Sequence, residues 1–197
     1  MKTFALIGSA SAAAAAVLLS ACASSPGMSH MSGMAPMAAM ASPMMVDNAK
    51  LPEPVRVPAG QKVRMVATGV GDLTYECREK KDMAGQHEWV FIGPVANLVS
   101  SDRKVVGKYY GGPTWESTDG SKITGKQLAV APGGTGNIPF QLVKTEPAMG
   151  AGAMNGVTYI QRINTKGGVA PAVACDVAGM GKKQTVKYEA DYVFYGS

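Results

Sequence analysis

The chain has 197 residues, of which 46% are hydrophobic, 17% charged and 7% aromatic. The charged fraction is below the ~25% usual for a soluble domain, and the shortage is local, because no Asp, Glu, Lys or Arg lies between Lys2 and Asp47. The first quarter of the chain is therefore excluded as a folded domain, whereas the remainder has the length and charge density of one. The 24 Gly and 12 Pro argue against long helices. The net charge is +5, and the basic residues after Lys2 are spread over the remainder of the chain rather than clustered, which argues against a nucleic-acid partner.

The first 22 residues predict export and lipid attachment. Lys2 precedes an apolar stretch, residues 4–19, that is shorter than the ~20 residues a spanning helix needs. The stretch ends in Leu19-Ser20-Ala21-Cys22, which resembles the bacterial lipobox, whose Cys is acylated and becomes the mature N-terminus. We predict a lipoprotein signal peptide over residues 1–21, a lipid anchor on Cys22 and a place in the cell envelope. Because Ala23 is not Asp, the periplasmic face of the outer membrane is favoured. A plain secretory peptide with a coincidental Cys is the alternative.

Residues 22–49 predict a flexible, disordered tether. Pro26, Pro36 and Pro43 argue against a helix. Methionines recur at every third residue, which would align their thioethers along one edge of a polyproline II chain, and thioethers suit Cu(I). Such runs look like the copper-binding segments of some periplasmic copper-resistance proteins. The candidate Cu(I) ligands are Met28, His30, Met31, Met34, Met37, Met40, Met44 and Met45. The alternatives are a linker that only provides reach and a scavenger of oxidants.

Residues 50–197 predict a single all-β domain, an antiparallel β-sandwich or barrel. Apolar and polar residues alternate with period two, which is typical of half-buried strands. The alternating or compact apolar runs are 63–67, 73–78, 89–92, 157–164 and 186–195. Turn signals separate them at 69–72, 119–121, 132–134, 166–168 and 179–181. Several short strands at this spacing are typical of a sandwich or barrel.

The cysteine count agrees with export. If Cys22 carries lipid, Cys77 and Cys175 remain as an even pair in an oxidising compartment, and we predict a disulfide between them. Two buried free thiols are the alternative. A redox centre is not expected, because the chain has no Cys-x-x-Cys.

Residues 109–119 are the densest functional candidate. Aromatic side chains beside carboxylates can line a cleft for a sugar or another small ligand. The candidate ligand-binding residues are Tyr109, Tyr110, Trp115, Glu116 and Asp119, together with Arg162. Glu116 and Asp119 are also the candidate acid/base pair of an enzyme acting on an envelope carbohydrate. In the structural alternatives Trp115 packs in the core, Asp119 initiates a turn, and Arg162 pairs with Glu116 or Asp191.

Motifs of metal and nucleophile chemistry are missing from the sequence. His30 and His87 are its only histidines, and it contains no His-Glu-x-x-His, Gly-x-Ser-x-Gly or zinc-type Cys cluster. Residues 120–126 imitate a P-loop, but Gln127 replaces the hydroxyl residue that would hold Mg²⁺. No catalytic residue is therefore assigned.

Motifs spread along the second part of the chain carry a family resemblance. They are Tyr75-Glu76-Cys77, Trp89-Val90-Phe91, Gly112-Pro113-Thr114-Trp115-Glu116, Ile138-Pro139, Gln161-Arg162-Ile163-Asn164-Thr165, Gly167-Gly168-Val169-Ala170-Pro171 and Ala190-Asp191-Tyr192. In order and spacing, residues 50–195 resemble domain of unknown function 3455, a family of secreted domains found in bacteria and fungi. The resemblance implies one secreted domain and no stated activity. The family often has His near the position of Tyr109 and Trp near that of Phe140, so chemistry carried by that His would be lost here.

These patterns favour an envelope-anchored lipoprotein whose β domain binds a small ligand, a partner or a cell-wall component without catalysis. One alternative is a periplasmic enzyme that uses Glu116 and Asp119. Another is an inhibitor of a wall hydrolase such as lysozyme, because exported β-barrel lysozyme inhibitors are also lipoproteins with a Tyr-x-Cys strand, as in Tyr75-Glu76-Cys77.

Overall fold

A computed structural model describes residues 46–197 of the chain. The predicted signal peptide, the lipidation residue Cys22 and the candidate copper ligands from Met28 to Met45 lie outside the described residues. In the part that is described, no helix is long and apolar enough to span a bilayer.

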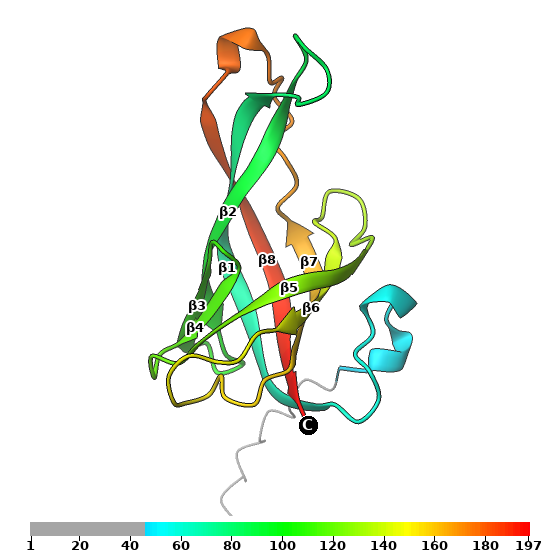
Figure 1. The fold of residues 1–197 in the computed structure, drawn as a ribbon, viewed down its shortest axis with the longest axis vertical. Coiled ribbons are helices and arrows are strands. Elements are labelled where there is room, and N and C mark those ends of the chain that lie inside the picture. Colours follow the sequence, from blue (N-terminus) through cyan, green and yellow to red (C-terminus); the bar gives the residue numbers. More distant parts are fainter. Residues whose placement is uncertain (1–45) are drawn as a thin grey trace, which may run out of the picture. The chain divides into compact units, whose positions relative to one another are not determined.

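Eight antiparallel strands form one closed barrel in which each strand pairs with the next and the last pairs with the first (Figure 1). The strands are β1 (Lys62–Glu79), β2 (His87–Val99), β3 (Val105–Tyr110), β4 (Thr114–Ser117), β5 (Lys122–Ala131), β6 (Phe140–Thr145), β7 (Tyr159–Gly167) and β8 (Lys183–Gly196). Three short 3-10 helices accompany them: η1 (Asn48–Lys50), η2 (Glu53–Val55) and η3 (Val177–Gly179). The all-β prediction is confirmed, and of its two forms the barrel is observed.

Two of the predicted turns differ from the structure. β7 extends to Gly167, so the turn predicted at 166–168 begins later than expected. The turn predicted at 69–72 is wrong, because β1 runs unbroken through it and pairs with β2 and β8 along this stretch. At Gly69 and Gly71 there is no room for a side chain. A Cβ at Gly69 would lie 2.5 Å from the Tyr192 ring, and a Cβ at Gly71 would clash with the Val95 carbonyl oxygen. Strand interiors use glycine in this way where backbones or rings approach closely.

The distal ends of β1, β2 and β8 extend beyond the barrel as an arm (Figure 1). A disulfide between Cys77 and Cys175 joins β1 to the segment that precedes η3, so this prediction is confirmed. The Trp89 indole N–H donates to the Val173 carbonyl at 2.8 Å and holds the same segment against β2. The arm is therefore fixed by one covalent and several hydrogen-bonded links.

The barrel interior is filled mainly by aromatic side chains. Its buried aromatic residues are Tyr75, Tyr109, Trp115, Tyr188, Tyr192 and Phe194. The Tyr109 ring stacks on Trp115 with ring centroids 4.8 Å apart, and Trp115 has no exposed surface. Aromatic rings bury much apolar area at low entropic cost, which suits a small barrel with few interior positions.

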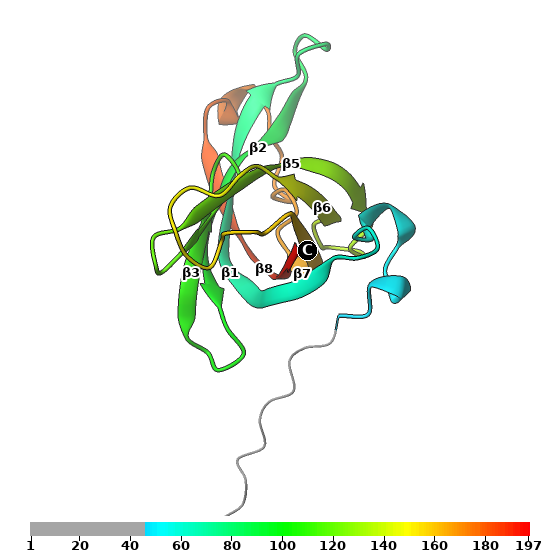
Figure 2. The ribbon, with the colours of Figure 1, turned by 60° about the horizontal axis from the view of Figure 1, so that its bottom comes forward.

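Residues 46–59 form a strap outside the barrel (Figure 2). Val55 and Val57 are buried against the outward face of β6, β7 and β8 in a second apolar cluster. The fully buried Gln161 amide N–H donates to the Val55 carbonyl at 2.5 Å, and the Tyr195 hydroxyl donates to Gln161 Oε1 at 2.9 Å. The end of the predicted tether, residues 46–49, thus belongs to a segment that is packed on the domain.

Candidate functional site

A cavity of about 460 Å³ opens at one end of the barrel. Neighbouring strands run in opposite directions, so this end of the barrel contains the β3–β4 turn and the β5–β6 loop. The C-terminal halves of β1 and β7 lie at the same end. The residues that line this mouth pocket are Leu73, Tyr75, Phe91, Ile92, Gly93, Pro94, Tyr109, Gly111, Gly112, Pro113, Gly125, Gln127, Ile138, Pro139, Gln141 and Arg162.

The loop that forms one wall of the mouth pocket is held in place by side chains behind it. Asn137 donates from its amide to the Gly133 carbonyl at 3.1 Å and accepts from the Gly167 N–H at 2.8 Å. The Thr165 hydroxyl donates to the Ile138 carbonyl at 2.7 Å. This wall is therefore preformed, as is usual for small-molecule sites.

Tyrosines lie at the base of the mouth pocket and behind it. The Tyr75 hydroxyl donates to the Gly168 carbonyl at 2.7 Å, and the hydroxyls of Tyr188 and Tyr192 lie 3.2 Å apart. Burial raises the pKa of Tyr75, Tyr109 and Tyr192 above the ordinary tyrosine range. These phenols are therefore neutral at physiological pH.

Arg162 brings the one formal charge to the lining. Strand alternation directs Ile160 and Arg162 toward the interior, whereas Gln161 and Ile163 face the strap. Its Nε and Nη2 donate to the Pro139 carbonyl at 3.2 and 2.9 Å. Its positive charge partly offsets the rise that burial causes in the pKa of Tyr75 and Tyr109.

The expected pairing of Arg162 with Glu116 or Asp191 is wrong. None of the ion pairs among residues 46–197 includes Arg162. Glu116 instead pairs with Lys122 at 3.3 Å. Asp191 accepts hydrogen bonds from Thr68 and Asn164 at 2.8 Å each. Both carboxylates that were expected to pair with Arg162 therefore have other partners, outside the barrel interior.

The candidate residues from the 109–119 segment are divided between two faces. Tyr109 lines the mouth pocket and Trp115 packs behind it, as the structural alternative for Trp115 expected. Tyr110 and Glu116, one strand position away from them, are on the opposite face, where the Tyr110 hydroxyl donates to Glu116 Oε2 at 2.6 Å. Period-two alternation alone explains this division.

Neither candidate carboxyl is arranged as a general acid. The hydrogen bond from Tyr110, followed by that from Lys122, lowers the pKa of Glu116. Asp119 accepts from the Ser121 hydroxyl and N–H and from the Ala153 N–H, at 2.6 to 2.9 Å, which lowers its pKa to about 2. A glycosidase acid needs a raised pKa. Asp119 organises the β4–β5 turn, in agreement with its structural alternative.

Sequence reasoning missed much of the apolar rim. Phe91 is 49% exposed and contacts Tyr75 edge-on, with ring centroids 5.6 Å apart, and Ile92 lies beside it. A bulge between Thr74 and Tyr75 shifts the pairing here. The apolar run 89–92 could have indicated this rim. Two consecutive large apolar residues cannot both face the core of a regular strand, so one of them is expected at the surface.

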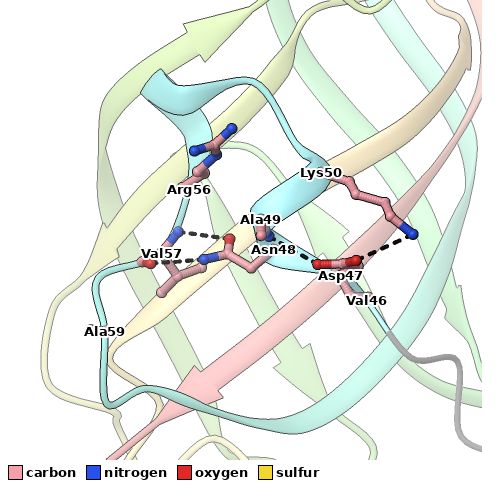
Figure 3. Close-up of a pocket in the computed structure, with 8 residues that line it drawn as sticks. All are labelled: Val46, Asp47, Asn48, Ala49, Lys50, Arg56, Val57 and Ala59. Carbon is pink, nitrogen blue, oxygen red and sulfur yellow. Dashed lines mark hydrogen bonds and ion pairs between the residues drawn. The ribbon is translucent and has the colours of Figure 1, made fainter.

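A second and larger cavity, of about 820 Å³, lies at the strap (Figure 3). Its lining residues satisfy one another: Asn48 exchanges hydrogen bonds with the backbone of Val57 at 2.9 and 3.0 Å, and Asp47 pairs with Lys50 at 3.3 Å. Arg56, which also lines this cavity, donates from Nε to the Leu51 carbonyl at 2.7 Å. We place the candidate site at the mouth pocket because its walls carry aromatic and proline side chains, which the lining of the strap cavity lacks. Among the described residues, no group of three His, Cys, Asp or Glu side chains could hold a metal ion.

The fold and the mouth pocket define a class of protein, a small closed β-barrel with a ligand-sized cavity at one end. Residues 58–196 match the family model described as Protein of unknown function (DUF3455), and the chain belongs to this family. No curated protein and no solved structure matches the chain. The wall-hydrolase inhibitor hypothesis stays a prediction, which residual lysozyme activity in the presence of the protein would test.

Proposed function

We propose that the protein is an envelope lipoprotein whose barrel binds a small molecule in the mouth pocket without transforming it. The preformed cavity of about 460 Å³ carries this proposal. Ligand sites are typically clefts of ~300–1,000 Å³ with mostly apolar walls and a few placed polar groups. Here proline, isoleucine and phenylalanine side chains surround Arg162, Gln127 and Gln141.

Binding is favoured over catalysis by the chemistry of the lining. The titratable side chains of the mouth pocket are Tyr75, Tyr109 and Arg162, with no carboxyl, imidazole or thiol among them. The neutral phenols do not serve as bases at physiological pH, and a guanidinium neither gives up nor accepts a proton there. The pocket therefore contains no general base and no ionised nucleophile at physiological pH. The hydroxyl of Tyr75, which could donate a proton, is already hydrogen-bonded to the Gly168 carbonyl.

The lipid anchor is the other part of the proposal, and Cys22 in its lipobox-like setting supports it. More than one acyl chain on this residue would give stable attachment, since each buried CH₂ contributes ~0.8 kcal/mol. Cys22→Ser should abolish incorporation of labelled palmitate and acyl-dependent fractionation with membranes. A variant that still incorporates palmitate would show that the anchor is elsewhere.

Ligand binding can be tested with N-phenylnaphthylamine, an uncharged dye that fluoresces in apolar sites. The described residues belong to one compact unit, Ala41–Ser197, so a chain that begins at Ala23 keeps every described contact and needs no detergent. Titration of this chain should give saturable binding at one site.

The matched variants locate that site. Gly111 lines the mouth pocket, and a Cβ there would meet no atom within 4 Å. Gly111→Leu should therefore fold normally and weaken dye binding about tenfold or more, because the new side chain fills space that the dye needs. Ala84→Leu, in the exposed turn between β1 and β2, is the control and should bind as the parent does. No saturable binding, or equal binding by Gly111→Leu, would overturn the proposal.

A further inference from the structure

We propose that the mouth pocket selects carboxylate ligands with an apolar body and that Arg162 binds the carboxylate. This inference rests on the proposed function and adds the ligand class. The observations that carry it are an arginine without an acidic partner, a lining without negative charge, and an apolar rim beside it.

The charge of Arg162 is uncompensated within residues 46–197. A guanidinium has five N–H groups, and two of those in Arg162 donate to the neutral Pro139 carbonyl. The other three have no protein acceptor among the described residues, and the side chain lines the cavity. A ligand that covers this charge must compensate for the water that it removes, and an anion does so best.

The surroundings of Arg162 favour an anion rather than another hydrogen-bond acceptor. Tyr75 and Tyr109 remain neutral, and no Asp or Glu lines the pocket, so nothing there repels negative charge. By contrast, Arg78 pairs with Glu76 at 2.9 Å on the arm. The cavity that Arg78 lines also contains the carboxylates of Glu79, Asp82 and Glu88, whereas the cavity that Arg162 lines contains none.

A single guanidinium also limits the ligand's charge. The lining contains one cation and no second lysine or arginine. A monoanionic carboxylate matches that charge and the planar, bidentate geometry of the guanidinium. A dianionic phosphate would leave one negative charge without a counterion, and we therefore favour the carboxylate.

The apolar residues at the entrance of the mouth pocket indicate that the ligand has an apolar body. Phe91 and Ile92 are 49% and 37% exposed at the entrance, although both are large and apolar. Pro113 and Pro139 provide rigid apolar walls beside them. Covering such surface contributes roughly 25 cal/mol per Å², so a ligand gains from filling the entrance as well as from reaching Arg162.

The test compares naphthoate with naphthamide, which share one ring system and differ in charge. Calorimetry or NMR titration of the chain that begins at Ala23 should show naphthoate binding about tenfold or more tightly than naphthamide. Naphthyl phosphate, the third probe, should bind less tightly than naphthoate. This comparison uses the unaltered pocket, so it decides the question without relying on any variant.

The variants assign the selectivity to one side chain. Arg162→Gln should weaken naphthoate binding about tenfold to a hundredfold and naphthamide binding much less, so that the ratio of the two affinities falls toward one. Circular dichroism and Tm of the variant check that the barrel is intact. Arg162→Lys keeps the positive charge but lacks the planar, bidentate guanidinium, so it should retain part of the preference for naphthoate over naphthamide. Arg103→Gln removes the same charge from an exposed turn and should change neither affinity.

The possible failures are distinguishable. Equal affinity for naphthoate and naphthamide would overturn the selection of anions and leave the proposed function standing. A preference for naphthyl phosphate would show that the ligand class is a phosphate. A naphthoate preference that survives in Arg162→Gln would show that another group binds the anion. If neither probe binds, and N-phenylnaphthylamine also fails to bind, the proposed function itself is wrong.

Discussion

Removal of the disulfide is predicted to lower the stability of the whole barrel rather than of the arm alone. Cys77 and Cys175 are 98 residues apart, and the loop that they close contains β2 to β7. In the chain-entropy model, a cross-link that closes a loop of about 100 residues destabilises the unfolded state by ~4.7 kcal/mol, within the ~2–5 kcal/mol typical of native bridges. We expect the Trp89–Val173 hydrogen bond to remain in the variant without the disulfide, where it would stabilise only the folded state.

The expected change is therefore a loss of several kcal/mol on replacing both cysteines with alanine. For a domain of this size, ~1 kcal/mol corresponds to a shift in Tm of about 2–4 °C, so Tm should fall by about 10 °C or more. Thermal unfolding of the chain that begins at Ala23, followed by circular dichroism, measures this shift, with the parent chain and Ala84→Leu in the exposed turn between β1 and β2 as controls. An unchanged Tm together with faster hydrogen exchange only in residues 169–182 would refute the reasoning and show that the bridge merely ties down a loop.

Three further predictions concern the turn, the strap and the tether. The pKa of Asp119 lies at about 2 against an ordinary 3.8, so its stabilising effect is present above pH ~4 and is lost as the pH falls toward ~2; Asp119→Asn should flatten acid unfolding over that window. Gln161→Met leaves the Val55 carbonyl and the Tyr195 hydroxyl without partners, and denaturant titration should show a loss of about 1–3 kcal/mol. A peptide of residues 23–49 should bind Cu(I) in preference to Zn²⁺ under a competing chelator and should lose most of its affinity when its methionines become leucine. A steeper acid transition in Asp119→Asn, unchanged unfolding of Gln161→Met or equal Cu(I) binding by the leucine peptide would contradict the respective prediction.

The alternation of apolar and polar residues was enough to predict the all-β class and parts of β1, β2, β7 and β8, but it did not predict β3 to β6. Residues 186–192, for example, alternate and lie within β8. The same local signal failed at 69–72, where glycine normally marks a turn. There the requirement is tertiary: Tyr192 of the paired strand β8 needs the space that a Cβ on Gly69 would fill. A single sequence does not show which ring lies opposite which glycine.

The candidate site was predictable only in part for a similar reason. Strand period separates Tyr109 and Trp115 from Tyr110 and Glu116 onto opposite faces, which sequence reasoning could have applied within the 109–119 segment. The meeting of Tyr109 with Phe91, Ile138 and Arg162 depends on barrel closure, which brings β2, β3, β7 and the β5–β6 loop to one end. Closure follows from long-range pairing, and no local pattern encodes it.

The location of a bound ligand tests the central claim most directly. Amide chemical shifts recorded during titration with naphthoate should change most at the residues that line the mouth pocket, including Phe91, Gly111, Ile138 and Arg162. The strap cavity around Asn48 and Val57 and the outer face that carries Tyr110 and Glu116 should change little. Shifts concentrated at the strap or on that outer face, with the mouth pocket unaffected, would contradict the account.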